Sequence, residues 1–304
     1  MSFTQGLKKL AKALSIDYIA TIIESAARLT HFRLKFGVRV VFWAGRERKS
    51  LLPIDIVIPV IDKDAETLPY VIDSARKHIR HPIKDIYLVC PGNSVLVKRI
   101  AVEKDCKVVD EGTLVPIAPG DIRYVWKGID RGSWIYQQFL KWSGGKFCTQ
   151  GHYLVMDSDT AFIRSQVFEI DDELIFDFCD EYNEAYFLAF ERIVGIKPRS
   201  TVSFTSHHAL IDIKSMDRLI RDIEALHDMP WYMAIISAID EGELSCISDY
   251  DNYGQYFFET TPNKMRVRYW HNKSLSRTSL GDMERLVRKY GKRYSTLSFH
   301  SYNK

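Results

Sequence analysis

Hydrophobic and polar positions follow two different periods along the middle of the chain. Short apolar runs rich in β-branched residues, typical of buried strands, alternate with stretches in which apolar residues recur every three or four positions, as in helices. From residue 51 the pattern predicts strand, helix, strand, helix and strand over 54–60, 68–79, 86–90, 95–103 and 107–109. This order predicts a parallel sheet with helical crossovers, and therefore an α/β fold.

The second half of the chain continues the alternation. We expect helices over 133–142, 216–227, 231–239 and 249–258, and strands over 153–156, 173–178, 207–213 and 265–270. Ser248 is a typical helix N-cap, and Asp249 and Asp251 after it place carboxylates near the positive end of a helix. The sequence shows no internal repeat and no low-complexity linker.

The first 50 residues form a segment of their own, which we interpret as a basic amphipathic helical extension. Leu7, Leu10, Leu14 and Tyr18 recur at helical spacing, and lysines lie beside them. Further basic residues surround the apolar run at 40–43. Such a segment can pack on the body of the protein or lie in the headgroup region of an anionic membrane leaflet, and the two roles are compatible.

Composition and charge narrow the class of protein. A chain of 304 residues, 46% of them hydrophobic, can bury a full core. The five cysteines are dispersed and form no Cys-x-x-Cys pair, so neither a disulfide framework nor a zinc ribbon is indicated. No apolar stretch approaches the ~20 residues that span a bilayer, and the start lacks the features of a signal peptide. We therefore expect a cytoplasmic protein.

The net charge of +3 conceals a strong asymmetry. Residues 1–50 carry ten Lys and Arg against three Asp and Glu, a balance of +7, and residues 263–304 carry eleven against two, a balance of +9. The middle of the chain is therefore at −13. Basic ends around an acidic body can indicate an anionic partner, either a membrane surface or a phosphate-bearing ligand, and they can also be solvated faces. Nucleic acid is disfavoured, because no recognition module is present.

The tripeptide Asp157-Ser158-Asp159 directly follows an apolar strand pattern at 153–156. In an open α/β sheet, ligands bind beyond the carboxyl ends of the strands. Mg²⁺ and Mn²⁺ prefer carboxylate, water and phosphate oxygens, so this pair can hold a divalent ion that in turn binds a diphosphate. The alternative is an ordinary strand-end turn, in which Asp and Ser are common.

From about Ile54 to His271 the chain resembles the GT-A class of glycosyltransferases, which use nucleotide sugars and usually a divalent metal. The resemblance rests on the strand end at 58–60 and on four motifs in order: Gln137-Gln138-x-x-Lys141, Asp157-x-Asp159, His207-His208 and Ser248-Asp249-Tyr250-Asp251. It is closest to poorly characterised bacterial members with the same motif order.

The resemblance implies a Rossmann-like, mostly parallel sheet flanked by helices. After the extension at 1–50, it implies one catalytic domain over 51–304, with a nucleotide-binding half at 51–160 and an acceptor half at 161–304. It also implies roles for single residues. Asp157 and Asp159 would hold Mn²⁺ or Mg²⁺ on the donor diphosphate, and a late histidine, His271 before His300, would be a further ligand.

The donor would contact six residues, by the same resemblance: Pro59, Val60, Asp62, Gln137, Lys141 and Asp157. Cations stabilise the negative charge that develops on the departing phosphate, and Lys141, Arg266, Arg268 and Lys273 are the candidates. An inverting reaction also needs a base for the acceptor hydroxyl. Asp249 is the first choice and Asp251 the second, although helix capping would equally explain Asp249. A retaining reaction needs no such base.

Adjacent residues of a strand point to opposite faces, so only one side chain of His207-His208 can face the site. The leading functional hypothesis is a metal-dependent enzyme that transfers a sugar from a nucleotide-sugar donor to a bacterial lipopolysaccharide, capsule or exopolysaccharide acceptor. We expect it in the cytoplasm, where it can be peripheral on the inner face of the cell membrane. Two alternatives stay open: nucleotidyl transfer on the same fold, and carbohydrate binding without turnover.

Overall fold

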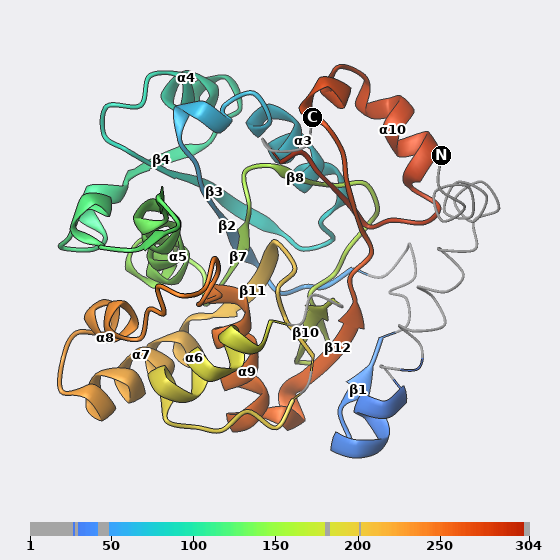
Figure 1. Cartoon of the computed structure of the whole chain (residues 1–304). Coiled ribbons are helices and arrows are strands. Elements are labelled where there is room, and N and C mark those ends of the chain that lie inside the picture. The colour runs from blue at the N-terminus through green and yellow to red at the C-terminus, as the bar shows by residue number, and fades with distance from the viewer. Residues whose placement is uncertain (1–26, 28–29, 42–48, 180–182, 201, 301–304) are drawn as a thin grey trace, which may run out of the picture.

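The structure is a computed structural model that describes residues 27, 30–41, 49–179, 183–200 and 202–300 (Figure 1). The amphipathic helix expected near the start of the chain lies outside the described residues. The body is a mixed α/β structure in which helices flank a mostly parallel sheet, and the predicted α/β class is therefore confirmed.

The central sheet has five strands in the order β11–β7–β2–β3–β4 (Figure 1). Their bounds are β2 (Ile54–Pro59), β3 (Ile83–Cys90), β4 (Lys107–Asp110), β7 (His152–Met156) and β11 (His208–Asp212). Strands β7, β2, β3 and β4 pair in parallel, whereas β11 is antiparallel to β7. All six residues of β2 are buried, as expected of a strand covered on both faces.

The strand order reverses between β2 and β7. Along the chain, β3 and β4 extend the sheet on one side of β2, and β7 then returns to its other side. Open α/β sheets bind their ligands beyond the carboxyl ends of the strands at such a reversal. The segments after Pro59 and Met156 therefore flank the expected binding position.

Eight helices with described bounds surround the sheets. They are α3 (Leu68–His78), α4 (Leu96–Glu103), α5 (Gly132–Trp142), α6 (Glu184–Val194), α7 (Ile213–His227), α8 (Trp231–Ser237), α9 (Asp249–Thr260) and α10 (Met283–Tyr290). Figure 1 shows α6, α7, α8 and α9 together on one side of the molecule, and α3, α4 and α10 on the other. Helix α5 packs against β2 and also contacts α9, so it joins the central sheet to the second half of the chain.

Three smaller sheets complete the fold. One has the order β1–β12–β10–β9, with β1 (Arg39–Val40), β12 (Met265–Tyr269), β10 (Glu173–Phe178) and β9 (Glu169–Ile170). Another has the order β13–β14–β8, with β13 (Asn272–Ser274), β14 (Thr296–Ser298) and β8 (Thr160–Phe162). A short hairpin pairs β5 (Val125–Trp126) with β6 (Ile129–Asp130). Because β8 begins directly after Asp159, the pairing of β14 with β8 brings the C-terminal part of the chain to the Asp-x-Asp motif.

The described part of the first 50 residues packs on the body. Residues 30–36 are helical, and Phe32, only 1% exposed, lies with its ring centroid 5.2 Å from that of Phe258. Strand β1 then pairs in parallel with β12. No helix among the described residues is long and apolar enough to cross a membrane.

Candidate metal centre

Asp157 and Asp159 are positioned by the strands on either side of their turn. Asp157 follows the last residue of β7, and its backbone N–H donates to the carbonyl of His207 at 3.0 Å. The carbonyl of Asp159 accepts from Phe299 N at 2.8 Å, just beyond β14. Backbone pairing thus fixes both carboxylates at the carboxyl edge of the central sheet, next to the reversal of strand order.

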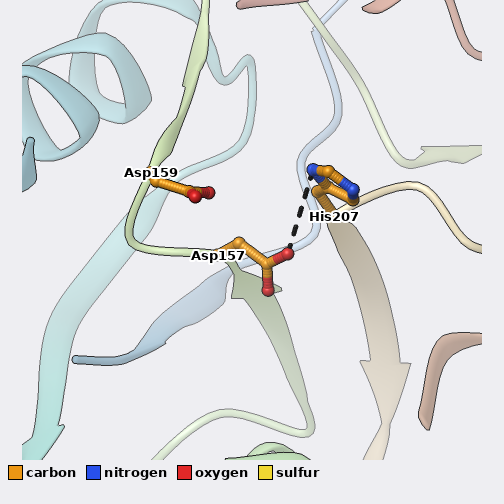
Figure 2. Close-up of side chains that lie close together, drawn as sticks. All are labelled: Asp157, Asp159 and His207. Carbon is orange, nitrogen blue, oxygen red and sulfur yellow. Dashed lines mark ion pairs between the residues drawn. The ribbon is translucent and has the colours of Figure 1, made fainter. Parts of the chain in front are cut away.

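Asp157, Asp159 and His207 form a group that can bind a metal ion (Figure 2). One ligand atom of each lies within 4.8 Å of the others. Figure 2 shows the three side chains directed toward a shared space, with Asp157 and Asp159 on one loop and His207 opposite them. The three ligand atoms lie close enough together to share one ion, and two carboxylates with an imidazole suit Mn²⁺.

One oxygen of Asp157 carries two donors. Lys141 Nζ lies 2.8 Å from Asp157 Oδ1, and the hydroxyl of Tyr250 donates to the same oxygen at 2.8 Å. Burial alone would raise the pKa of Asp157, but Lys141, His207 and Tyr250 lower it below its usual value. The carboxylate is therefore ionised at neutral pH.

Lys141 lies between two carboxylates. Its Nζ is 3.2 Å from Asp249 Oδ2 as well as 2.8 Å from Asp157, and it sits 4.2 Å from the centroid of the Tyr250 ring. Burial would lower the pKa of Lys141, yet Asp157 and Asp249 raise it above its usual value, so the amine stays charged. Asp159 adds a third carboxylate near Asp157, and the resulting excess of negative charge over the single cation Lys141 suits a divalent cation.

The two adjacent histidines have separate environments. His207 Nδ1 lies 3.9 Å from Asp157 Oδ2 and 3.2 Å from Thr160 Oγ1. Burial lowers the pKa of His207 to about 4, against the opposing effect of Asp157, so its imidazole is neutral at pH 7 and able to bind a metal. His208 points away from the group and contacts Asp177 Oδ2 through Nε2 at 2.7 Å.

His271 and His300 differ in their distance from the acidic pair. The ring centroid of His271 lies 4.8 Å from that of Tyr269, and among the described residues His271 does not join the Asp157, Asp159 and His207 group. His300 Nδ1 lies 2.9 Å from Asp159 Oδ2, since it follows β14. Of the two late histidines, the structure thus places His300 in contact with the acidic pair.

Asp249 begins α9 and is held from α5. Its backbone N–H donates to Gln138 Oε1 at 2.7 Å, and Trp142 Nε1 donates to its carbonyl at 3.3 Å. Burial raises the pKa of Asp249, and Lys141 opposes that increase. Gln137 is half-buried on the same helix as Lys141. The Gln-Gln-x-x-Lys helix therefore supports the start of α9 next to Asp157.

Asp251 supports a loop. Its carboxylate accepts from Phe204 N at 2.7 Å, Ser203 Oγ at 2.8 Å and Thr205 Oγ1 at 3.2 Å. It is 2% exposed. These contacts hold the segment that leads to His207, so the structure gives Asp251 a clear positioning role.

Burial raises the pKa of Asp251 from 3.8 to about 6, although its hydrogen bonds lower it. The folded protein therefore binds the proton of Asp251 more tightly than the unfolded chain does. The contribution of Asp251 to the free energy of unfolding is greatest below pH 4 and falls by about 3 kcal/mol as the pH rises through 6. We expect Asp251→Asn to flatten this decrease, as measured by urea unfolding at pH 4 to 7. An unchanged slope in the variant would assign the pH dependence to other groups.

The other predicted donor contacts lie at the end of β2. Pro59 ends the strand, and Val60, 4% exposed, donates its N–H to Val89 O. Asp62 accepts from the N–H groups of Val95 and Val97 and so caps α4. A cavity of about 460 Å³ opens nearby, beyond β3 and β4. Its lining includes Gly92, Asp110, Glu111, Pro119 and Tyr136.

The four candidate cations also differ. Lys141 contacts Asp157, whereas Arg266 binds Glu173 at 2.8 Å and Arg268 binds Asp177 at 2.5 Å. Lys273 lies in β13.

Sequence reasoning overlooked Tyr250 and the cavity beyond β4. The available signal for Tyr250 was its place in the Ser-Asp-Tyr-Asp motif, because it directly follows the candidate site residue Asp249 in the first turn of the same helix.

Residues 52–287 match the family DUF6492, described as a family of unknown function. No curated protein sequence matches the chain. Three solved structures show some likeness. The galactosyltransferase LgtC, with donor and acceptor sugar analogs, is 13% identical, with 82% of this chain and 88% of that chain covered and a TM-score of 0.44. Mycobacterium tuberculosis glucosyl-3-phosphoglycerate synthase, with Mn²⁺, uridine diphosphate and phosphoglyceric acid, is 13% identical, with 83% of this chain and 84% of that chain covered and a TM-score of 0.40. Mouse xyloside xylosyltransferase 1 is 11% identical, with 83% of this chain and 99% of that chain covered and a TM-score of 0.46. These TM-scores lie below 0.5, so the functional argument rests on the residues of this chain.

Proposed function

The chain belongs to the DUF6492 family, and we propose that it is a metal-dependent glycosyltransferase of the GT-A class that uses a nucleotide-sugar donor. One observation carries the proposal. Asp157, Asp159 and His207 converge within 4.8 Å beyond the carboxyl end of β7, beside the reversal of strand order at which α/β sheets bind their ligands.

Asp157, Asp159 and His207 would hold Mn²⁺ or Mg²⁺, and His300 is a further candidate through its contact with Asp159. When bound, the ion supplies positive charge that stabilises a departing nucleoside diphosphate. His271 stays a prediction as a ligand, although the contacts favour His207 and His300. Lys141 is a fixed, desolvated cation whose charge faces the same space, and such preorganised charge stabilises the transition state more than the ground state.

The nucleoside would lie between the end of β2 and the cavity beyond β4. Pro59 and Val60 lead into this region, and Asp62 holds the start of α4 at its edge. Asp249 is the candidate base for the acceptor hydroxyl in an inverting reaction. Its ion pair with Lys141 keeps the carboxylate in a fixed orientation, and the burial that raises its pKa increases its basicity.

A panel of nucleotide sugars with Mn²⁺ tests the proposal. We expect one donor to release its nucleoside diphosphate, slowly to water and faster once an acceptor is present. Release of inorganic diphosphate instead would indicate nucleotidyl transfer. Sugar binding that persists without metal, together with no donor consumption, would indicate a non-catalytic carbohydrate-binding protein.

The acceptor is proposed to be a lipopolysaccharide, capsule or exopolysaccharide precursor at the inner face of a bacterial cell membrane. The basic ends of the chain, +7 over residues 1–50 and +9 over residues 263–304, support an anionic acceptor or membrane surface. Deletion of residues 1–24 is expected to reduce sedimentation with vesicles containing phosphatidylglycerol and to leave nucleoside diphosphate affinity unchanged. Vesicle binding equal to that of the full chain would contradict a membrane role for this segment.

A further inference from the structure

Tyr250 and Lys141 both bind the same oxygen of Asp157. Each donor atom lies 2.8 Å from Oδ1, and the two approach from different helices, α9 and α5. The other oxygen, Oδ2, is the one that faces His207, with 3.9 Å to Nδ1. The carboxylate of Asp157 is thus divided into an oxygen that the protein occupies and an oxygen that faces the candidate metal ligands.

We propose that Tyr250 is a positioning residue that restricts Asp157 to binding the metal through Oδ2 alone. The inference rests on the metal site of the proposed function. A carboxylate with two free oxygens can bind an ion through one or both of them, and Ca²⁺ accepts bidentate carboxylates in a flexible shell. Mg²⁺ requires near-octahedral geometry with shorter bonds. Occupation of Oδ1 therefore favours the smaller ion.

Tyr250 is itself firmly held. It is 5% exposed, and it lies in the first turn of α9, which Ser248 caps by accepting from Asp251 N at 3.2 Å. Gln138 binds the N–H of Asp249, the residue before it, from α5. A side chain fixed in this way can transmit its position to the ligand it contacts, and loss of such a supporting hydrogen bond typically costs 10–100-fold in metal affinity.

Lys141 cannot replace the tyrosine in this role. Its amine is shared between Asp157 and Asp249, at 2.8 and 3.2 Å, so its position depends on both carboxylates and it does not orient Asp157 alone. The hydroxyl of Tyr250 is carried by a rigid ring with fewer rotatable bonds, and it donates to Asp157. Lys141 therefore contributes positive charge, whereas Tyr250 fixes the orientation of the Asp157 carboxylate.

Tyr250→Phe tests the proposal, because phenylalanine keeps the ring and removes only the hydroxyl. Titration of Mn²⁺ into the full-length protein without nucleotide, followed by calorimetry, is expected to give a dissociation constant about 10–100 times that of wild type. Competition by Ca²⁺ should become stronger in the variant. Tyr253→Phe is the matched control: this residue is also buried in α9, but its hydroxyl accepts from Asp212 N. It should melt at a lower temperature than wild type and keep the wild-type affinity for Mn²⁺.

Three outcomes are distinguishable. Tyr250→Phe with the wild-type Mn²⁺ affinity would overturn the positioning role. Equal weakening by Tyr250→Phe and Tyr253→Phe would also overturn it, because the cause would then be a general loosening of α9. If wild type binds no Mn²⁺ while Tyr250→Phe and Tyr253→Phe fold normally, the metal site of the proposed function fails, and the positioning role fails with it.

Discussion

Alanine in place of Asp159 is expected to lower the rate of nucleotide-sugar consumption roughly 10³-fold or more, equivalent to about 4 kcal/mol of transition-state stabilisation. The side chain belongs to the Asp157 and His207 group and also contacts His300 at 2.9 Å. Its loss removes one of two carboxylates from the candidate metal site, so the negative charge of the departing diphosphate is left with weaker support. Steady-state release of nucleoside diphosphate measures the effect.

Asp73→Ala is the control for this variant. The Asp73 side chain is 58% exposed in α3 and pairs with Lys104 at 2.6 Å, far along the chain from the Asp-x-Asp motif. It should keep the wild-type rate. Asp159→Ala should melt within a few degrees of wild type, so that lost activity reflects chemistry. A rate within threefold of wild type in a folded Asp159→Ala protein would remove this residue from the mechanism.

The largest loss of stability is expected from Asp177→Ala. Asp177 and Arg268 are register partners on β10 and β12, joined by hydrogen bonds of 2.5 and 2.8 Å, and His208 adds a third contact at 2.7 Å. The side chains of Asp177 and Arg268 are 4% and 9% exposed. Removal of the carboxylate leaves the guanidinium buried without its counter-charge, which costs about 3–5 kcal/mol of unfolding free energy.

Urea unfolding measures this loss, and two comparisons identify its cause. Asp73→Ala, which breaks an exposed pair, should cost no more than about 1 kcal/mol. The double variant Asp177→Leu with Arg268→Met replaces the ion pair by apolar side chains and should lose less than Asp177→Ala alone, because no charge is left buried. A single variant no less stable than the exposed control would contradict the account of this pair.

Much of the fold follows from hydrophobic periodicity. The expected strand at 54–60 is β2, the helix at 133–142 is α5, and the strand at 153–156 is β7, each within about one residue at either end. These elements are long or strongly apolar, so local sequence determines them. The same reasoning places two carboxylates at the end of β7, which is why Asp157 and Asp159 could be singled out before the structure.

The histidines show where sequence reasoning stops. Strand β14 has three residues and no periodicity of its own, and it forms because Thr296 to Ser298 pair with β8. That pairing, between residues more than 130 positions apart, brings His300 to Asp159. His271 follows a strand with a clear pattern, and this made it the more visible candidate. Strand β11 brings His207 to the acidic pair in the same way. Its first residue, His208, lies opposite Met156, so His207 lies beside Asp157.

The charged residues show a second limit. Arg268 and Lys141 are both basic residues that could support a leaving phosphate. Arg268, however, binds Asp177 across two strands, whereas Lys141 binds Asp157. Sequence spacing does not distinguish a buried structural pair from a catalytic one, since both need a cation opposite a carboxylate. Asp62, used to cap α4, makes the same point.

The most direct test of the account is donor consumption by the wild-type protein before and after chelation. With the nucleotide sugar identified by the panel, EDTA should reduce release of nucleoside diphosphate to the background rate, and excess Mn²⁺ should restore it. Calorimetry should show one Mn²⁺ bound per chain in wild type and much weaker binding in Asp159→Ala. Full turnover in the presence of EDTA would contradict the claim that a divalent ion held by Asp157 and Asp159 supports the reaction.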